Sequence, residues 1–318
     1  MNSRIIKAIL QKKFNDWIGT IKNTDVQNKA RKNSIITGGC ITSLLLKEKV
    51  NDFDVYFTNF ETAELVSRYY VAEFLRLHEG KDTPKPFVKI DDTEGKPKRV
   101  RIRIISKGIA GENTPESQYQ YFEGIPIEEG DIYTSQTISD VLEDADSLDG
   151  TKLDEDGHKE KYRPVFMSDN AITLSNQIQL VIRFYGDADE IHKNYDFAHC
   201  TNYWESGNGN LTLRQDALES ILARELRYVG SLYPVCSFIR TRKFIQRGWH
   251  INAGQMLKIC LQISELDLTD LETLEDQLTG VDTAYFIQVI DYPKERQNKD
   301  ENFKFGAPYL ISIIDKIF

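Results

Sequence analysis

Residues 34–46 read Ser-Ile-Ile-Thr-Gly-Gly-Cys-Ile-Thr-Ser-Leu-Leu-Leu, and residues 50–58 read Val-Asn-Asp-Phe-Asp-Val-Tyr-Phe-Thr. The first stretch is a short apolar run that reaches a Gly-Gly pair and continues into a second apolar run. This pattern predicts a strand, a tight turn at Gly38 and Gly39, and a helix that ends near Lys47. The second stretch predicts another strand, so the segment is expected to form a strand–turn–helix–strand unit.

The glycine turn and the acidic pair of this unit both favour phosphate chemistry. Glycines let the backbone approach a ligand closely, and the N-terminus of the following helix presents N–H groups to an anion. In Asp52-Phe53-Asp54, alternate side chains share one face of the strand, so the two carboxylates point the same way, about 7 Å apart at Cα. Mg²⁺ binds carboxylate and phosphate oxygens and would relieve their repulsion. Taken singly, each motif also fits an ordinary structural turn or a solvated strand edge.

Twelve residues separate Gly39 from Asp52, and this order of motifs resembles the DNA-polymerase-β-like nucleotidyltransferase superfamily. The signature of that superfamily is a Gly-Gly or Gly-Ser turn followed by Asp-hydrophobic-Asp-hydrophobic. It is matched by Gly38, Gly39, Asp52, Phe53, Asp54 and Val55. Cys40 departs from it, because many members carry serine there and a thiol is a weaker donor to phosphate. Either Thr42 or Ser43 takes that contact, or the phosphate is held more weakly.

The resemblance also implies a third carboxylate on a neighbouring strand. Residues 178–200 look like the matching part of viral-type nucleotidyltransferase-like proteins, in which a strand, a short helix and a second strand follow an insertion. This likeness makes Asp196, in a strand expected at residues 195–200, the preferred third acid. Asp91 and Asp92 are the alternative, and a turn-capping role is the alternative for Asp196 itself.

The remaining hydrophobic periodicity predicts an α/β N-terminal half and a helical C-terminal half. With the resemblance, this implies an α+β fold with a nucleotidyltransferase-type mixed sheet, flanking helices and a C-terminal helical domain. The expected domains are residues 1–204, an α/β nucleotidyltransferase domain with an acidic insertion at about 80–170, and residues 205–318, a helical substrate-binding domain. Acids accumulate between residues 128 and 160, which predicts a solvated surface loop rather than a cation site. Further strands are expected at residues 100–105 and 178–184, and further helices at residues 4–21, 61–77, 187–193, 212–228, 235–247, 252–263 and 270–278.

The helix expected at residues 235–247 carries the candidate substrate contacts. Arg240, Lys243 and Arg247 share one face, which suits either a triphosphate or an RNA backbone, or else is a solvated helix face. Phe238, Ile239 and Ile245 are then expected to face the core. Three side chains could stack on a base but are typical of a core as well: Tyr228, Tyr233 and Trp249. His192 and His199 are interpreted as local hydrogen-bonding groups, and Cys200, Cys236 and Cys260 as buried apolar residues.

Composition sets outer limits on the function. The chain has 318 residues, a formal charge of −9, a pI of about 5.2 and 40% hydrophobic residues, so it is not a disordered protein or a general nucleic-acid coat protein. No apolar run reaches the roughly 18 residues of a membrane helix. The N-terminus lacks a signal-peptide pattern, which predicts a cytoplasmic protein, in the host cytosol if the chain is viral. The four cysteines have no CxxC spacing, and no disulfide-linked partner is expected.

Together these observations predict a metal-dependent nucleotidyltransferase. The resemblance implies two Mg²⁺ or Mn²⁺ ions held by Asp52, Asp54 and Asp196, and transfer of an NMP from an NTP such as ATP to an acceptor hydroxyl, with release of pyrophosphate. The acceptor is an RNA 3′ end such as that of tRNA, a small molecule or a protein side chain. The alternative is a catalytically inactive nucleotide-binding or interaction module on the same fold. The residues expected to bind the NTP are Gly38, Gly39, Thr42, Ser43, Arg240 and Lys243.

Overall fold

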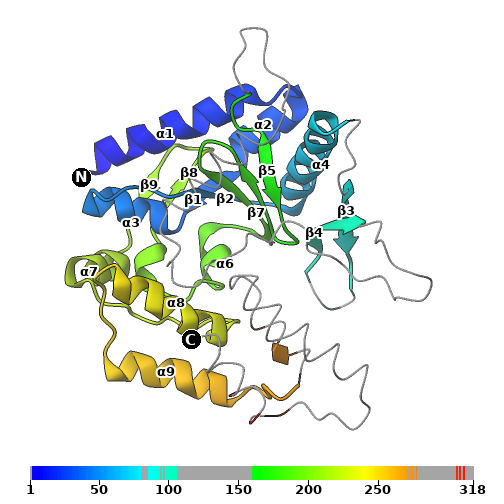
Figure 1. Cartoon of the computed structure of the whole chain (residues 1–318). Helices are drawn as coiled ribbons and strands as arrows, with labels where there is room; N and C mark the ends of the chain where they lie inside the picture. The colour runs from blue at the N-terminus through cyan, green and yellow to red at the C-terminus, as the bar shows by residue number, and fades with distance from the viewer. Residues whose placement is uncertain are drawn as a thin grey trace. The chain divides into compact units, whose positions relative to one another are not determined.

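The structure is a computed structural model of the chain, and it describes residues 2–79, 85–93, 95, 97–105 and 160–270, together with 273, 274, 277, 306, 308 and 311 (Figure 1). The described residues fall into two compact units. The first holds residues up to 105, 160–192 and 200–214, and the second holds residues 193–199 and those from 215 onward. Apart from Glu160, the acidic stretch of residues 128–160 lies outside the described residues.

A seven-stranded mixed sheet forms the centre of the first unit, in the order β5-β6-β7-β2-β1-β8-β9. Strands β2 and β7 run parallel, whereas the other neighbours are antiparallel. This sheet and its helices confirm the predicted α+β class with a mixed sheet and flanking helices. The strands are β1 (Ser34–Thr37), β2 (Phe53–Phe57), β5 (Pro164–Met167), β6 (Ala171–Leu174), β7 (Ile178–Tyr185), β8 (Tyr203–Glu205) and β9 (Leu211–Thr212).

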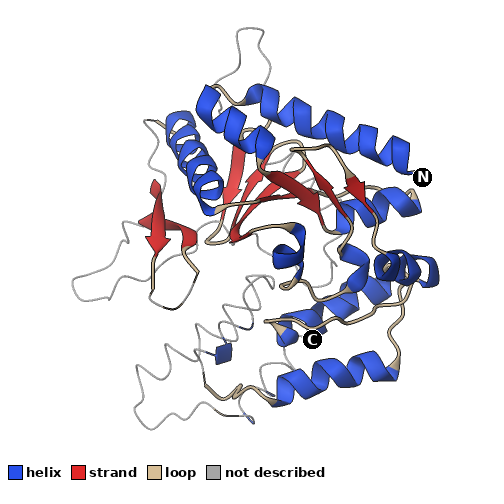
Figure 2. Ribbon diagram, turned by 180° about the vertical axis from the view of Figure 1, so that it is seen from behind, coloured by secondary structure: helices blue, strands red, loops and turns tan. Residues whose placement is uncertain are grey.

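Three helices cover one face of this sheet, namely α1 (Ser3–Thr20), α2 (Thr24–Lys32) and α4 (Phe60–Leu77), as Figures 1 and 2 show. Strand β2 turns Phe53, Val55 and Phe57 toward them, because alternate residues of a strand share a face. Asp54, between Phe53 and Val55, therefore points to the opposite face of the sheet. Trp17 of α1 is fully buried, and its Nε1 donates a hydrogen bond of 2.7 Å to the hydroxyl of Tyr70 in α4. The expected helices at residues 4–21 and 61–77 are confirmed.

A separate two-stranded ribbon of β3 (Lys85–Asp91) and β4 (Arg99–Ile105) packs on α4. Val100 and Ile102 are buried in the same hydrophobic core as the sheet. Their alternation with arginines gives the ribbon one apolar face and one basic face. The strand predicted at residues 100–105 is confirmed.

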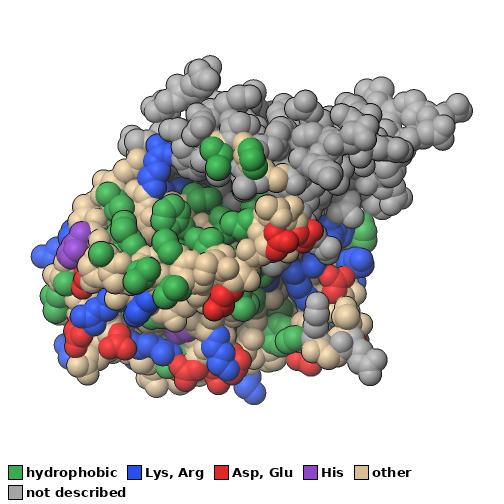
Figure 3. Space-filling view, turned by 90° about the horizontal axis from the view of Figure 1, so that it is seen from below, with side chains coloured by type: hydrophobic (Ala, Val, Ile, Leu, Met, Phe, Trp, Pro, Cys, Tyr) green, Lys and Arg blue, Asp and Glu red, His purple; other side chains and the backbone are tan. Residues whose placement is uncertain are grey.

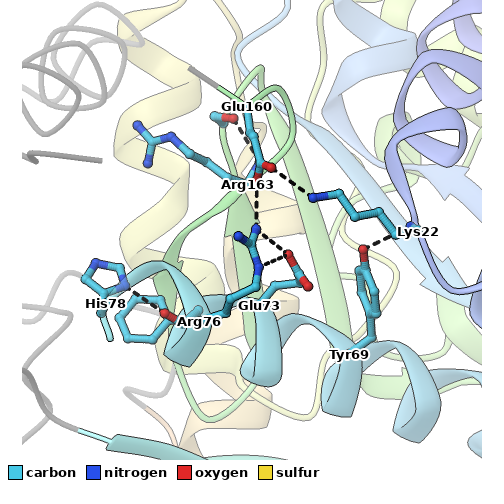
Figure 4. A network of polar contacts seen from close by, with 9 residues as sticks. Lys22, Tyr69, Glu73, Arg76, His78, Glu160 and Arg163 are labelled. Atoms are coloured by element: carbon cyan, nitrogen blue, oxygen red, sulfur yellow. Dashed lines mark hydrogen bonds and ion pairs between the residues drawn. The ribbon is translucent and has the colours of Figure 1, made fainter. Parts of the chain in front are cut away.

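Glu160 lies at the centre of a polar network (Figure 4). Glu160 accepts hydrogen bonds of 2.9 Å from Lys22 Nζ and from an Arg76 guanidinium nitrogen, and Arg76 also pairs with Glu73. The Lys22 ammonium, followed by the Arg76 guanidinium, lowers the pKa of the Glu160 carboxyl. The backbone N–H of Lys22 donates to the Tyr69 hydroxyl. The network thus links residue 160 to α4 and to the connection between α1 and α2.

The second unit is helical, with α7 (Gln215–Ala223), α8 (Pro234–Gln246) and α9 (Ala253–Ser264). The last two confirm the helices expected at residues 235–247 and 252–263. The helix predicted at residues 212–228 is correct only for residues 215–223, since Thr212 belongs to β9 and the helix ends before Arg224. Arg224 has a φ of 49°, and residues 224–226 instead form a backbone bridge with His250.

Two expectations about side-chain burial are also wrong. Phe238 and Ile245 of α8 are 49% and 47% exposed, because the helix buries Cys236, Ser237 and Thr241 instead. Cys260 is exposed and Cys200 half-buried, so only Cys40 and Cys236 are buried thiols. Apolar side chains also reach the surface on α9, where Leu257 is 59% exposed. Figure 3 shows such hydrophobic groups on the face seen from below.

Candidate functional site

The register of β1 against β2 brings the glycine turn to the acidic pair. In this antiparallel pairing Thr37 lies opposite Asp54, and Gly38 follows at once. Gly38 has φ 93° and ψ −156°, a backbone region that is essentially open to glycine alone. Its N–H donates to the Cys200 carbonyl, 3.1 Å away. The chain then enters α3 (Gly39–Leu46) at the exposed Gly39, so this helix N-terminus begins beside Asp54.

Asp52 and Asp54 are the two carboxylates at this point. Asp52 is exposed just before β2, and Asp54 is half-buried within it. Gln179 lies directly across from Asp54 on the parallel strand β7. With its amide turned so that the nitrogen faces the acids, Nε2 lies 3.0 Å from Asp54 Oδ1 and 3.3 Å from Asp52 Oδ2. Both carboxylates therefore converge on one neutral amide. The Asp-x-Asp spacing predicted that the two acids point the same way, but it did not reveal Gln179.

This set of oxygen ligands suits a divalent cation. Carboxylate oxygens on one side of a strand, with an amide oxygen available if Gln179 turns over, are the hard ligands that Mg²⁺ and Mn²⁺ prefer. Within the part of the chain that the structure describes, no three His, Cys, Asp or Glu side chains form a cluster able to hold a metal. The donors assembled at this site are thus two acids and one amide.

Cys40, the departure from the signature, is a buried and protonated thiol. Burial, together with the nearby Asp54 and Asp52 carboxylates, raises its pKa well above the usual range. Its Sγ lies 3.6 Å from the Thr37 carbonyl, to which the thiol donates. Cys40 therefore adds no charge to the site. Thr42 and Ser43 are buried within α3, which leaves their hydroxyl groups little access to a phosphate.

A buried histidine fixes the residue opposite Asp54. The Thr37 hydroxyl lies 2.9 Å from the Asn202 carbonyl, to which it donates, and 2.8 Å from His192 Nε2. Because the hydroxyl proton is used on Asn202, His192 donates to Thr37 through Nε2. Burial, followed by the charge of Arg214, lowers the pKa of His192 to about 4, so the ring is neutral. Its interpretation as a local hydrogen-bonding group is confirmed.

Asp196 belongs to the second unit and has a cationic partner. The strand predicted at residues 195–200 is wrong. Residues 198–200 form a 3₁₀ turn, and Phe197 makes only an isolated bridge with Tyr228. Arg240 donates a hydrogen bond of 2.8 Å to Asp196 Oδ2, and the Asp196 side chain is only 10% exposed. Its role as a third ligand stays a prediction, as does NTP binding by Arg240 and by the exposed Lys243.

The alternative third acids also pair with cations. Asp91 accepts from Arg101 on the adjacent strand of the ribbon, and Asp92 lies 2.8 Å from Lys98. The candidate stacking residues Tyr228 and Trp249 are 4% and 5% exposed, which confirms their core interpretation.

His199, buried beside Asp196, packs on an aromatic cluster. Its ring centroid lies 4.3 Å from that of Trp249 and 4.7 Å from that of Phe244. Burial lowers its pKa to about 4, although Asp196 opposes this shift.

Among the described helices, none combines the length and apolarity needed to cross a membrane.

Known proteins resemble parts of this chain. Among curated proteins, "Gabija anti-defense 2" of Bacillus phage SPbetaL7 is 26% identical over 144 residues, which are 44% of this chain and 33% of that protein. The chain thus spans about a third of the length of this relative. Among solved structures, the Bacillus stearothermophilus CCA-adding enzyme in complex with CTP gives a TM-score of 0.36 at 12% identity, over 87% of this chain and 51% of that one. The Thermotoga maritima CCA-adding enzyme complexed with tRNA gives 0.35 at 13% identity, over 83% and 49%.

A family model covers a larger part of the sequence. The model of the Gabija anti-defense 2 family matches residues 8–224. This range includes β1, α3, β2 and β7, and with them the glycine turn, both carboxylates and Gln179. Since the match extends over more than half of the 318 residues, the chain belongs to the Gabija anti-defense 2 family.

Proposed function

We propose that this chain is a metal-dependent nucleotidyltransferase that counteracts a Gabija-type defence system by moving an NMP from an NTP to an acceptor hydroxyl. The anti-defence role follows from the family, and the chemistry from one observation. The β1–β2 register sets the Gly38 turn directly against Asp54, which supports a phosphate site beside the acidic pair at this end of the two strands.

The residues of the glycine turn would bind the triphosphate. Gly39 is exposed at the first position of α3, and a Cβ built on it meets no atom within 4 Å. A phosphate could therefore approach the N–H groups at this helix N-terminus, where the helix dipole also favours an anion. The neutral Cys40 thiol adds no negative charge to repel it.

Asp52 and Asp54 would hold Mg²⁺ or Mn²⁺. Bound there, the metal would supply charge neutralisation for the phosphates and activation of the acceptor hydroxyl. Gln179 would orient the two carboxylates through its amide, and the Thr37–His192 bond would fix the strand opposite them. A second ion would need Asp196 as a ligand, and Asp196 would first have to leave Arg240.

The acceptor in this proposal is an RNA 3′ end, a small molecule or a protein side chain, and the reaction releases pyrophosphate in the cytoplasm. The test incubates the full chain with each α-labelled NTP, Mg²⁺ or Mn²⁺, and total RNA or lysate from cells that carry the defence system. We expect labelled product from the wild type and from an Asp16→Ala/Asp25→Ala control, which removes two exposed acids of α1 and α2. The Asp52→Ala/Asp54→Ala variant should give none. Equal labelling by that variant would show that the assigned site is wrong.

A second candidate is a nucleotide-binding module without catalysis. It is favoured by Gln179, which sets an amide directly across from Asp54, and by the pairing of Asp196 with Arg240. Equilibrium dialysis separates the two candidates. NTP binding that depends on Asp52 and Asp54, without label transfer to any acceptor, would support the binding module.

A further inference from the structure

One face of the β3–β4 ribbon carries a concentration of positive charge that the proposed nucleotidyl transfer does not use. The register sets Phe87 opposite Arg103 and Lys89 opposite Arg101, so the odd-numbered side chains of both strands share this face. The opposite face is fixed, since Val100 and Ile102 are buried in the core. We call this surface the basic face. Its described side chains are those of Lys85, Phe87, Lys89, Asp91, Arg99, Arg101 and Arg103.

The charge of the basic face contrasts with that of the whole chain. Residues 85–103 contain seven basic and three acidic residues, whereas the protein carries a formal charge of −9. Two carboxylates offset part of this charge. Asp91 pairs with Arg101 and, at 3.6 Å, with Lys89, and Asp169 lies 3.3 Å from Arg101 and 3.4 Å from Arg103. Three of the five cationic side chains of the basic face, Lys89, Arg101 and Arg103, thus lie within 4 Å of these two carboxylates.

The ion pairs also hold the arginines in place. Arg101 and Arg103 share the Asp169 carboxylate, and an Arg99 guanidinium nitrogen donates to Asn170 on the same turn between β5 and β6. Their side chains keep about a quarter of their surface exposed, at 25% for Arg101 and 24% for Arg103. Guanidinium groups fixed in this way lose little conformational entropy when they bind an anion.

An aromatic ring lies among these cationic side chains. Phe87 is 40% exposed, with Lys85 and Lys89 two residues away on either side and Arg103 across the ribbon. An exposed phenylalanine flanked by cations has the chemistry of a single-stranded nucleic-acid site, in which bases stack on the ring and phosphates meet the lysines and arginines. We propose that the basic face binds single-stranded nucleic acid, with a base on Phe87 and the backbone along Lys85, Lys89 and Arg103.

Single strands fit this surface better than duplexes do. The bases of a duplex are already stacked on one another, so Phe87 could reach none of them without unpairing. The proposal does not depend on catalysis, because binding to the ribbon needs neither an NTP nor Asp52 and Asp54. It is therefore tested with a strand that cannot be extended.

The probe is a fluorescent 12-nucleotide oligo(U) with a blocked 3′ end, titrated with the full chain by anisotropy at several salt concentrations and without NTP. We expect Lys85→Ala/Lys89→Ala to reduce the slope of log K against log salt by about 1.4, since each phosphate contact with a single strand contributes about 0.7. Phe87→Ala should weaken binding about tenfold, because one base–aromatic stack is lost, whereas Phe87→Trp should retain it. An unlabelled duplex of the same length should compete poorly.

The matched control is Arg4→Ala/Lys12→Ala, which removes two exposed cations from α1. It should leave the slope and the affinity unchanged. The proposal is overturned if the control and the lysine variant change the slope equally, or if Phe87→Ala binds as tightly as the wild type. Thermal melting of each variant checks that it folds. Should Phe87→Ala melt early, Lys85→Glu/Lys89→Glu at the two exposed positions must abolish binding for the proposal to stand.

Discussion

Asp54 in the first unit and Asp196 in the second have different hydrogen-bond partners. Asp54 faces the neutral amide of Gln179 and lies opposite Thr37, which bonds to the neutral His192. Asp196 is held by the Arg240 guanidinium, 2.8 Å away.

The difference indicates two uses of a carboxylate. The Asp52 and Asp54 carboxylates share the amide of Gln179, whereas the Asp196 carboxylate is paired with an arginine, which offsets its charge within the protein. We therefore expect the proposed transfer to depend more on Asp52 and Asp54 than on Asp196.

The largest expected effect tests this contrast directly. Asp54→Asn should lower the rate of label transfer at least 100-fold, a loss of about 3 kcal/mol of transition-state stabilisation, because a metal ligand is removed. Asp196→Asn should lower it less than tenfold. Single-turnover transfer measured with saturating NTP gives both numbers, with Asp16→Asn as the control. Equal losses in the two variants, with unchanged melting temperatures, would restore Asp196 as a third ligand.

The motifs behind that prediction are the part of the site that local rules could find. Gly38 adopts a backbone conformation that requires glycine, and Asp52 and Asp54 share a face because strand side chains alternate. Neither inference needs knowledge of distant residues. The same is true of α1 and α4, whose apolar periodicity matches the buried residues.

What local rules missed depends on contacts between distant segments. Gln179 joins the site only through the parallel pairing of β2 with β7, which residues 53–57 cannot reveal. Residues 195–200 look like a strand, but their backbone groups bond to residues 227–229, and the chain turns at 198–200. Helix α2 has only two buried residues, so periodicity gave little signal. The sequence signal for this helix was its N-cap residue Asn23, whose side chain accepts hydrogen bonds from the N–H groups of Asp25 and Val26.

The second prediction uses the two histidines to compare the units. Each has a folded-state pKa of about 4 against an ordinary 6.5, so the unfolded chain binds protons that the folded chain does not. The contribution of each neutral histidine to the free energy of unfolding is therefore complete above about pH 6.5 and is lost as the pH falls toward 4. This loss is at most about 3 kcal/mol for each histidine. Urea unfolding at pH 4.5, 5.5 and 7 should show this loss in the wild type.

Two substitutions assign the loss to its unit. His199→Phe keeps an aromatic ring beside Trp249 without a titrating group, and His192→Gln keeps a donor to Thr37. Each variant should lose stability less steeply between pH 6.5 and 4.5 than the wild type. A slope that neither substitution changes would mean that other groups cause the acid sensitivity.

A third prediction converts the neutral neighbour of Asp54 into a charged one. Gln179→Glu places three carboxylates together, which should destabilise the metal-free protein by about 1 kcal/mol through like-charge repulsion. Mg²⁺ should then raise the melting temperature of this variant more than that of the wild type, since a ligand that binds only the folded state stabilises it. Gln11→Glu, on an exposed position of α1, is the control. A variant that is as stable as the wild type and indifferent to Mg²⁺ would count against a metal at this edge.

The smallest expected effect lies in the second unit, where Asp196 and Arg240 can be removed singly and together. The Asp196 side chain is 10% exposed but that of Arg240 is 43% exposed, so solvent screens the pair and a coupling energy of only about 1 kcal/mol is expected. A double-mutant cycle with alanine, followed by urea unfolding in low and high salt, measures it. The Lys22–Glu160 pair, with side chains 65% and 31% exposed, should give about half as much or less. If Asp196 and Arg240 prove uncoupled while Asp196→Ala still abolishes transfer, this carboxylate serves the reaction rather than the packing of α8, and the contrast between the two acidic sites fails.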